Sequence, residues 1–398
     1  MSPAAANRTE AIGIVGAGQL ARMMAESASA LGLRAVVLAE RPDDSATAVA
    51  AEVVPGVPSV AADLTALAAR AAVVTFDHEQ VDLDLVAAVA AAGTVVRPGV
   101  DTLRMATDKA EMRRRVQAAG LPGPAFEVLA GGGVLAAVEG FAGRHGWPVV
   151  LKAARGGYDG KGVWPVAGPE EAARVVEEAD AAGTPLLVEE QVAIDAELAV
   201  VVARRPGGQA VTWTPVETAQ VGGVCREVLV PGRLDPAVVA DAAALGAAVA
   251  EVAGATGVLA VELFWSAGRL LVNEVAARPH NSGHWTIEGA VTSQFENHLR
   301  AVLDLPLGST AVAAPAVATV NVFGGPDGAD PVDRLAGALA VDGAHVHLYG
   351  KEPRPGRKLG HVTVCGEDPD DVRHRAWTAA RALGTVVPAG IDLDEEGP

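Results

Sequence analysis

The sequence predicts a protein of mixed α/β and α+β class, with an N-terminal parallel-sheet domain, a small central unit and a C-terminal region of antiparallel strands. Strands alternate with helices over the first hundred residues, which is typical of a parallel sheet. A glycine-rich loop lies inside the central unit, and paired strands joined by short turns dominate after residue 197. The 398 residues are enough for two or three domains.

The first predicted domain covers residues 1–100. An apolar strand at residues 11–18 ends in Gly16-Ala17-Gly18, and a helix follows to about Leu31. Further elements are expected as strands at residues 33–39, 73–76 and 95–97 and as a helix at residues 83–92. This alternation predicts a parallel sheet with helices on both faces.

The second predicted domain covers residues 101–197. It begins with one basic helix over residues 101–119, which Gly120 closes, and a proline-rich linker at residues 121–124. A small α/β unit then extends from Ala125 to about Val192 and contains the glycine-rich loop.

The third predicted domain covers residues 198–398. Strands at residues 199–204 and 210–215 flank the turn Pro206-Gly207-Gly208. A long helix over residues 236–256 and strands near residues 316–323, 345–349 and 361–365 follow. The last helix runs over residues 369–383, with Asp368 placed to cap it.

Composition narrows the classes of function. Half of the residues are hydrophobic and 20% are charged, as in soluble globular proteins. A net charge of −18 argues against a partner that is nucleic acid. Cys225 and Cys365 form no CxxC pair, which argues against zinc and disulfide frameworks. Neither a signal peptide nor a membrane span is visible, so we expect a cytoplasmic protein.

The glycine-rich loop is the most informative motif. An apolar strand at residues 150–152 delivers Lys152 to a loop that contains Gly156, Gly157, Gly160 and Gly162. Glycine allows a backbone to bring bare N–H groups close to a ligand, and lysine supplies positive charge. Because the segment lacks the GxxxxGK[ST] pattern of a Walker loop, we expect a polyphosphate cradle on a hairpin.

A second glycine motif lies near the N-terminus. Gly16-x-Gly18-x-x-Ala21, with Glu40 about twenty residues later, imitates the dinucleotide-binding fingerprint. The alternative is a turn that presents a helix N-terminus to any anionic ligand. An NAD-dependent dehydrogenase is therefore a competing function, although it leaves the loop around Lys152 unexplained.

Two carboxylates stand out in the third domain. Glu262 and Glu274 lie in apolar strands, and a hairpin centred on Gly268 would place them opposite one another. Facing like charges need a cation, and Mg²⁺ that bridges phosphate oxygens fits this need. The alternative is a pair of solvated glutamates on an exposed edge.

Three further segments carry candidate residues. Residues 278–285 bring Arg278, His280, Asn281 and His284 into one loop, which either binds an anion or is a structural turn. Residues 351–358 form a basic loop, which is either a phosphate-binding arm or a solvated surface loop. Glu189, Glu190 and Glu197 either contact a ribose and an adenine or are surface charges.

Taken together, these residues resemble an ATP-grasp enzyme. The runs GAGQL (16–20), RGGYDGKG (155–162), NEVAARPHNSGHWT (273–286) and PGRKLGH (355–361) closely resemble the N5-carboxyaminoimidazole ribonucleotide synthetase family of purine biosynthesis. The resemblance covers about residues 11–366. It implies a three-domain ATP-grasp architecture with a small lid domain, and an ATP-dependent carbon–nitrogen ligase that joins aminoimidazole ribonucleotide to bicarbonate through carboxyphosphate. It also implies Mg²⁺ as cofactor and a homodimer. A formate-using transformylase and a biotin-type carboxylase are alternatives within the fold, and the NSGHW run argues against both.

The resemblance also implies roles for individual residues. For ATP it implies phosphate contacts from Lys109 and Lys152, a ribose contact from Glu197, and further contacts from Asn273 and Glu274. The flap over the phosphates would contain Gly157, Tyr158, Asp159, Gly160, Lys161 and Gly162. The adenine hinge would consist of Glu189, Glu190, Gln191 and Val192. Glu262 and Glu274 match the Mg²⁺ ligands. Around the ribonucleotide it implies Gln19, Leu20, Glu79, Tyr158, Asp159, Lys351, Arg357 and Lys358, and around bicarbonate it implies Arg278, His280, Asn281 and His284.

The chain departs from the family pattern in two segments: Thr218-Ala219-Gln220 stands where an Asn-x-His is frequent, and the loop after Glu274 differs at two positions. Gln220 stands where the family often has a histidine, so a histidine contact to the nucleotide is in doubt. Ala277 stands where a proline is common, and Pro279 where a small apolar residue is common. These departures leave the charged residues of the loop in place.

Overall fold

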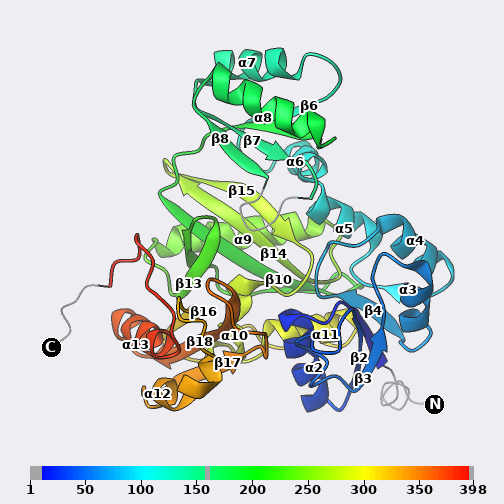
Figure 1. Cartoon of the computed structure of the whole chain (residues 1–398), viewed down its shortest axis with the longest axis vertical. Coiled ribbons are helices and arrows are strands. Elements are labelled where there is room, and N and C mark those ends of the chain that lie inside the picture. Colours follow the sequence, from blue (N-terminus) through cyan, green and yellow to red (C-terminus); the bar gives the residue numbers. More distant parts are fainter. Residues whose placement is uncertain (1–10, 157–161, 394–398) are drawn as a thin grey trace.

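The structure is a computed structural model that describes residues 11–156 and 162–393. Three sheets organise it (Figure 1): a parallel one near the N-terminus, a small antiparallel one and a large antiparallel one. The predicted fold class is therefore confirmed. The sheets occupy residues 11–96, 126–190 and 196–366, while the expected domain limits at residues 100 and 197 stay a prediction.

The N-terminal domain is a five-stranded parallel sheet in the order β3-β2-β1-β4-β5. Its elements are β1 (Ala11–Val15), α2 (Gln19–Ala30), β2 (Arg34–Ala39), β3 (Glu52–Pro55), α3 (Ala61–Ala68), β4 (Val73–Phe76), α4 (Leu83–Ala91) and β5 (Val95–Val96). The sequence did not predict β3 and α3. Apolar side chains of α3 and α4 pack on one face, and those of α2 pack on the other beside α11 (Gln294–Val302), which comes from far along the chain.

The basic segment after this sheet forms two helices, so the prediction of one helix over residues 101–119 was wrong. α5 (Val100–Thr107) and α6 (Lys109–Ala118) meet at Asp108, which has an extended backbone. The Asp108 carboxylate accepts a hydrogen bond from the backbone N–H of Glu111 at 3.0 Å and so caps α6. This cap outweighs the helical pattern that continues across it.

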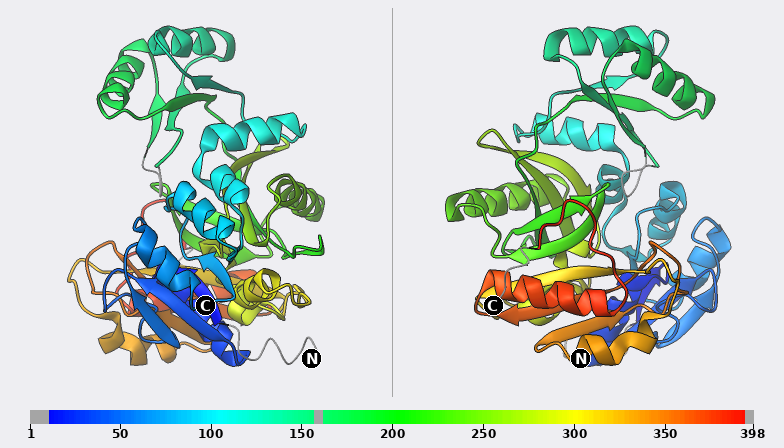
Figure 2. Two further views of the ribbon diagram at one scale, coloured as in Figure 1. Left: turned by 90° about the vertical axis from the view of Figure 1, so that its right-hand side faces the viewer. Right: turned by 60° about the vertical axis from the view of Figure 1, so that its left-hand side comes forward.

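The small sheet forms a lid that stands at one end of the molecule (Figures 1 and 2). Its elements are β6 (Phe126–Leu129), α7 (Val134–His145), β7 (Val149–Ala153), β8 (Val163–Val166), α8 (Pro169–Ala181) and β9 (Leu186–Glu190). The strands pair antiparallel in the order β6-β9-β7-β8, and apolar side chains of α7 and α8 pack on the sheet. β7 and β8 form a hairpin, which confirms that the glycine-rich loop connects two strands.

The large sheet has nine strands: eight follow the order β15-β14-β10-β12-β13-β16-β18-β17, and β11 pairs with β10. The strands are β10 (Ala196–Arg204), β11 (Ala210–Thr212), β12 (Val216–Val221), β13 (Val224–Val230), β14 (Gly257–Ser266), β15 (Arg269–Ala276), β16 (Ala316–Phe323), β17 (Ala344–Leu348) and β18 (Lys358–Gly366). The remaining helical elements are α9 (Pro236–Val252), η1 (Asn281–Gly283), α10 (Thr286–Gly289), η2 (Pro331–Arg334), α12 (Leu335–Leu339) and α13 (Pro369–Ala382).

Two helices cover different parts of this sheet. Side chains of α9 pack on β10 and β14, and those of α13 pack on β16 and β18. α9 ends before the predicted residue 256, because Gly254 adopts a left-handed backbone with φ of 59°. The predicted cap of α13 is confirmed, since the Asp368 carboxylate accepts from the N–H groups of Asp370 and Asp371 at 3.0 and 2.9 Å.

The β14–β15 hairpin turns through Ala267 and Gly268, whose φ angles are 47° and 75°. Its centre therefore lies between these residues, not on Gly268 as expected. A bulge at Asn273 adds one residue to β15, so Glu262 still pairs with Glu274 while Leu263 pairs with Val272. The predicted facing of the two glutamates is confirmed, but it depends on a bulge that the sequence analysis missed.

The N-terminal domain and the large sheet share one apolar core. Side chains from the parallel sheet, α5, α6, α9, β10, β14 and β15 belong to a single buried cluster. This shared core fixes the carboxylate-bearing hairpin relative to α6. Among the described residues, none of the helices combines the length and apolar character needed to cross a membrane.

Candidate active site

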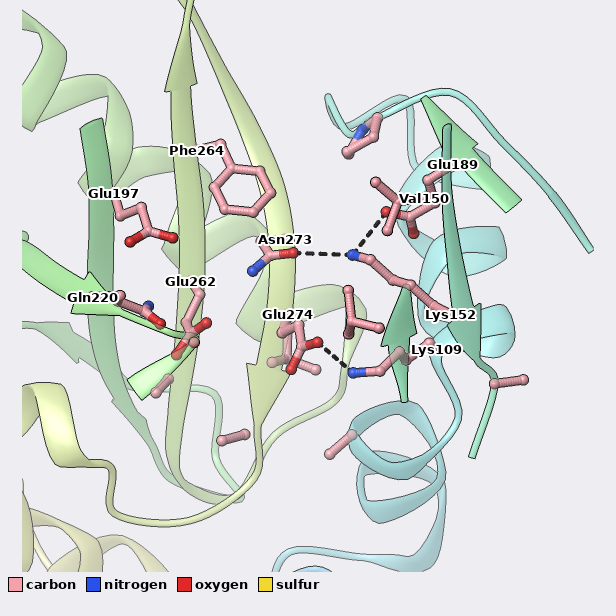
Figure 3. Close-up of a pocket in the computed structure, with 18 of the residues that line it drawn as sticks. Lys109, Val150, Lys152, Glu189, Glu197, Gln220, Glu262, Phe264, Asn273 and Glu274 are labelled. Atoms are coloured by element: carbon pink, nitrogen blue, oxygen red, sulfur yellow. Dashed lines mark hydrogen bonds and ion pairs between the residues drawn. The ribbon is translucent and has the colours of Figure 1, made fainter. Parts of the chain in front are cut away.

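A cavity of about 790 Å³ lies between the lid and the large sheet. Strands β7 and β9 of the lid line one side, and β10, β12, β14 and β15 line the other (Figure 3). Among the residues expected to form a site, those that line this cleft are Glu79, Lys109, Lys152, Glu189, Glu190, Gln191, Val192, Glu197, Glu262, Asn273, Glu274, Arg278 and His280. The fold therefore gathers residues as far apart in the sequence as Glu79 and His280.

Two lysines face the large sheet, and we call them the lysine wall: Lys109 at the start of α6 and Lys152 in β7. The Lys152 ammonium lies 2.8 Å from Glu189 Oε2 and 3.4 Å from Asn273 Oδ1. Lys109 forms an ion pair with Glu274 (Figure 3). Burial lowers the pKa of Lys152, and the charge of Glu189 opposes this shift.

The two glutamates at the end of β9 have carboxylates that are already engaged. Glu189 is buried and binds both Lys152 and Arg113, so it is not a surface charge. Burial alone would raise the pKa of Glu189, but Arg113 and Lys152 outweigh it and lower the pKa to about 2. Glu190 accepts a hydrogen bond from the N–H of Ala125 at 2.9 Å. The adjoining residues Gln191 and Val192 also line the cleft.

Three glutamates form the opposite side, and we call them the carboxylate wall: Glu197 on β10, Glu262 on β14 and Glu274 on β15. Burial, followed by the charges of Glu274 and Glu197, raises the pKa of Glu262 to about 7. Burial also raises the pKa of Glu197. Burial acts on Glu274 in the same direction, but Lys109 outweighs it and lowers the pKa of that carboxyl. The wall therefore carries more negative charge than its neighbours balance.

This wall has the donors that Mg²⁺ uses when phosphate oxygens complete its coordination: one or two carboxylates. Within residues 11–156 and 162–393, no three His, Cys, Asp or Glu side chains are grouped as a complete metal site. Glu262 and Glu274 supply the two carboxylates of such a Mg²⁺ site.

The corner of the cleft next to the N-terminal domain carries the loop after β15. Arg278 Nε lies 2.7 Å from Glu79 Oε2, and the N–H of Ala277 donates to Glu79 Oε1 at 3.0 Å. His280 Nε2 lies 3.6 Å from Glu262 Oε1, and its Nδ1 lies 2.9 Å from the Ser282 hydroxyl. Burial, with the charges of Arg278 and Lys358, lowers the pKa of His280 to about 3, so this imidazole is neutral.

The other predicted residues lie outside the cleft lining, and two of them, Gln19 and Lys351, meet between the N-terminal and C-terminal regions. Lys351 binds Gln19, and Lys358 binds Asn281, which follows the cleft residue His280. The residues outside the lining are Gln19, Leu20, Gly162, Asn281, His284, Lys351, Arg357 and Lys358. Gly157, Tyr158, Asp159, Gly160 and Lys161 lie outside the described part of the chain.

Two of these residues have side chains that the core encloses. The side chain of Leu20 belongs to the apolar core beneath α2. His284 is fully buried, with its ring 4.8 Å from that of His361. Burial, followed by the charge of Lys358, lowers the pKa of His284 well below its usual value. Neither side chain lines the cleft.

The turn at Gly16-Ala17-Gly18 is filled by the protein itself. Asp77 Oδ2 accepts from the N–H of Gly18 at 2.6 Å, and its Oδ1 accepts from the N–H of Ala21 at 2.8 Å. A Cβ atom on Gly18 would lie 2.5 Å from Asp77 Oδ2. The helix N-terminus that would bind the pyrophosphate of NAD thus already binds a carboxylate, which argues against the dehydrogenase alternative.

Sequence reasoning missed Phe264 and Arg113 and left the role of Gln220 open. Phe264 and Gln220 both line the cleft (Figure 3). Phe264 follows Glu262 by two residues on β14, so strand alternation could have identified it. Arg113 lies three residues from both Ala110 and Val116, on the buried stripe of α6, which marks it as an arginine with a buried partner.

Family comparisons divide the chain into three parts. The ribonucleotide synthetase preATP-grasp domain family matches residues 9–107, and the ATP-grasp domain family matches residues 114–295. The phosphoribosylaminoimidazole carboxylase C-terminal domain family matches residues 318–375.

Relatives resemble this chain over nearly its whole length. It is 44% identical to the N5-carboxyaminoimidazole ribonucleotide synthase of Mycobacterium leprae over 94% of this chain and 89% of that protein. It is 42% identical to the synthase of Corynebacterium ammoniagenes, over 94% and 91% of the two chains.

Solved structures of synthetases share the fold. The enzyme of Thermus thermophilus matches with a TM-score of 0.84 and 36% identity, over 95% of this chain and 99% of that one. The Aspergillus clavatus enzyme, in complex with ADP and 5-aminoimidazole ribonucleotide, matches with a TM-score of 0.85 and 28% identity, over 94% and 99%.

Proposed function

The chain belongs to the N5-carboxyaminoimidazole ribonucleotide synthase family of ATP-grasp enzymes, and we propose that it uses ATP to join 5-aminoimidazole ribonucleotide to bicarbonate. It is an ATP-dependent carbon–nitrogen ligase of purine biosynthesis. The products are N5-carboxyaminoimidazole ribonucleotide, ADP and phosphate. The observation that carries the proposal is the cleft in which a lysine wall faces paired carboxylates, with Arg278 and His280 at one end.

ATP lies in the cleft between the lid and the large sheet. Lys109 and Lys152 bind its phosphates, and the end of β9 with Gln191 and Val192 receives the adenine. Glu197 accepts hydrogen bonds from the ribose, and Phe264 offers an aromatic face beside it. Asn273, which binds Lys152, completes the phosphate side.

Glu262 and Glu274 would hold Mg²⁺, which neutralises phosphate charge when it is bound. The neighbouring residues prepare this role. Lys109 keeps Glu274 ionised. Burial, followed by the charges of Glu274 and Glu197, gives Glu262 a raised pKa that a cation would relieve.

The reaction brings two anions together. A bicarbonate oxygen attacks the γ-phosphorus as the bond to ADP breaks, which forms carboxyphosphate. Carboxyphosphate breaks down to CO₂ and phosphate, and the exocyclic amine of the imidazole captures the CO₂ and loses a proton. Lys109, Lys152 and Arg278 supply the positive charge that such a transition state needs. His280, which is neutral, is able to accept a hydrogen bond or a proton beside bicarbonate.

The ribonucleotide lies beside the cleft, between the N-terminal and C-terminal regions. Gln19 and the backbone of Leu20 approach it from α2, and Glu79 from the loop after β4. Lys351, Arg357 and Lys358 bind its phosphate, and Asn281 and His284 support the loop around bicarbonate. On the family resemblance we assign to residues 157–163 the role of a flap that keeps water from carboxyphosphate, and to Tyr158 and Asp159 a role beside the imidazole. The family relationship also supports a homodimer in the cytoplasm, which size-exclusion chromatography with light scattering and cell fractionation would test.

One assay tests the proposed function. Phosphate release from Mg²⁺–ATP is measured with both aminoimidazole ribonucleotide and ¹³C-labelled bicarbonate, and with each omitted in turn. We expect rapid release only when both are present, and ¹³C bonded to the exocyclic nitrogen of the product. ATP hydrolysis that ignores the ribonucleotide, or an unlabelled product, would overturn the proposal. A thermal-shift comparison of Mg²⁺–ATP with NAD checks the competing class.

A further inference from the structure

Arg113 is an arginine that no step of the proposed reaction uses. Its side chain is only 2% exposed and does not line the cleft. Its guanidinium donates two hydrogen bonds to the Glu189 carboxylate, from Nε to Oε1 at 2.6 Å and from Nη2 to Oε2 at 3.1 Å. Nη1 donates to the backbone carbonyl of Val272 at 2.6 Å. One side chain of α6 therefore joins the hinge strand β9 of the lid to β15 of the large sheet.

Arg113 also determines the charge that Lys152 presents to the cleft. Glu189 is a shared partner, because Lys152 lies 2.8 Å from the same Oε2 atom that Arg113 Nη2 binds. Arg113 and Lys152 contribute two positive charges and Glu189 one negative charge, so this buried group keeps a net charge of +1. Without Arg113 the net charge is zero, and Lys152 becomes the remaining counterion of a buried carboxylate.

The contact with Val272 places Arg113 next to the bulge. Val272 immediately precedes Asn273, the extra residue that brings Glu274 opposite Glu262. Its carbonyl accepts from Arg113, while its N–H donates to the carbonyl of Pro122 at 2.9 Å. The backbone before the bulge is thus held on both sides.

We propose that Arg113 is a positioning residue of the ATP site, which neutralises Glu189 so that the charge of Lys152 remains available to the polyphosphate. This inference rests on the proposed function, since it assumes that the cleft binds ATP. It predicts a specific defect. Loss of Arg113 should weaken the binding of the phosphates and leave the binding of the nucleoside unchanged.

The test compares ATP with adenosine by isothermal titration calorimetry, with the full-length protein and its Arg113→Met variant. We expect the affinity for ATP to fall about 10- to 100-fold, the range of one lost charge-assisted contact, and that for adenosine to change less than about twofold. Arg114→Met is the matched control, because it removes the same charge from the next, exposed position of α6. It should bind both ligands as the unaltered protein does.

Two further variants separate charge from structure. The double variant Arg113→Met/Glu189→Gln returns the net charge to +1, so we expect it to recover most of the affinity for ATP that Arg113→Met loses. Arg113→Lys keeps the positive charge but loses the bidentate contact with Glu189. Its affinity for ATP should also lie within about fivefold of that of the unaltered protein. These two variants carry the test if Arg113→Met fails to fold. In that case, a tenfold or larger loss of ATP affinity in both would overturn the inference.

The remaining outcomes are distinguishable. An equal loss for ATP and adenosine in Arg113→Met, or no recovery in the double variant, would show that Arg113 only supports the fold and would overturn its proposed role. An unchanged ratio of the two affinities would overturn that role as well. Failure of the unaltered protein to bind ATP would instead overturn the proposed function.

Discussion

The two walls of the cleft face each other but balance their charges differently. On the lysine side, Lys152 is matched by Glu189, which Arg113 also binds, so each buried charge has a partner within the chain. On the carboxylate side, Glu274 has Lys109, but no cation lies between Glu262 and the other two glutamates among the contacts of the described residues. The ions on the lysine side are therefore all paired and keep a net positive charge, whereas Glu262 on the carboxylate side lacks a cationic partner among these contacts.

This difference indicates where the chain depends on its substrates. Buried charges without partners destabilise a fold, so they persist where a ligand compensates for them. The raised pKa of Glu262 is consistent with this deficit, because burial and the neighbouring carboxylates favour a proton in place of a cation. Mg²⁺ carried by ATP would supply the missing positive charge. In the proposed function, the lysine wall supplies the charge that the phosphates need.

The largest expected effect comes from the carboxylate wall. Glu274→Gln removes one of the facing carboxylates and the ion-pair partner of Lys109. We expect turnover to fall about 10²- to 10³-fold, as for the loss of one group that stabilises transition-state charge. Phosphate release at limiting Mg²⁺ measures it. Glu251→Gln, at an exposed position of α9, is the control. Unaltered turnover in Glu274→Gln would remove this residue from the metal site.

A smaller effect tests whether the ATP phosphates are bound by the lysine wall and not by the basic loop that contains Arg357. Arg357 lies outside the cleft, with its Nη1 3.0 Å from the carbonyl of Glu352. If it binds the phosphate of the ribonucleotide, Arg357→Ala should raise the Michaelis constant for that substrate roughly 10- to 100-fold, which corresponds to about 1.5–3 kcal/mol. The Michaelis constant for ATP should stay the same.

The exposed Arg354, which pairs with Glu352, provides the matched control for this prediction. Arg354→Ala should change neither Michaelis constant by more than about twofold. Equal effects of Arg357→Ala on both Michaelis constants would place this loop at the ATP phosphates. The lysine wall would then not be the sole source of positive charge for ATP.

The smallest expected effect is on the stability of the fold, and it tests whether Glu262 lacks a compensating positive charge. The pKa of Glu262 is about 7 in the folded protein against a usual 4.5, so the folded state binds more protons than the unfolded state between these values. Its contribution to stability therefore falls as the pH rises through this window. Glu262→Gln should remove this loss, and without divalent cations it should be more stable above pH 7 by about 1–2 kcal/mol, given the partial exposure of the side chain.

Thermal unfolding of both proteins from pH 4.5 to 8, with a chelator present, measures this prediction. The difference in melting temperature should be near zero at the acid end and should grow with pH. A difference that does not depend on pH would show that Glu262 titrates normally in the folded protein.

The sequence predicted the elements whose signals are local. Apolar runs identified β4 and β16, and Asp368 before Pro369 identified the start of α13. The break between α5 and α6 also had a local signal, the Asp108-x-x-Glu111 capping pair, which the helical pattern around it obscured. β3 was missed because its four residues begin with a glutamate and end with a proline, so they do not form the continuous apolar run that identified the equally short β4.

The rest of the site could not be predicted because it depends on contacts between distant residues. Motifs identified Lys152, Glu262 and Glu274, but the bulge that aligns the glutamates follows from how β15 pairs with β14. Arg113, one of the two partners of Glu189, lies 76 positions away on another element. Sequence could likewise not show that Asp77 fills the turn at Gly18, which only the packing of β4 beside β1 reveals.

The most direct test of the charge difference between the two walls is the Mg²⁺ dependence of ATP binding. Calorimetry with saturating Mg²⁺ and with a chelator would compare the unaltered protein with the double variant Glu262→Gln/Glu274→Gln. The account predicts that Mg²⁺ strengthens ATP binding at least about tenfold in the unaltered protein and gives no gain in the variant, which still binds metal-free ATP through Lys109 and Lys152. A variant that retains the full gain from Mg²⁺ would contradict the account.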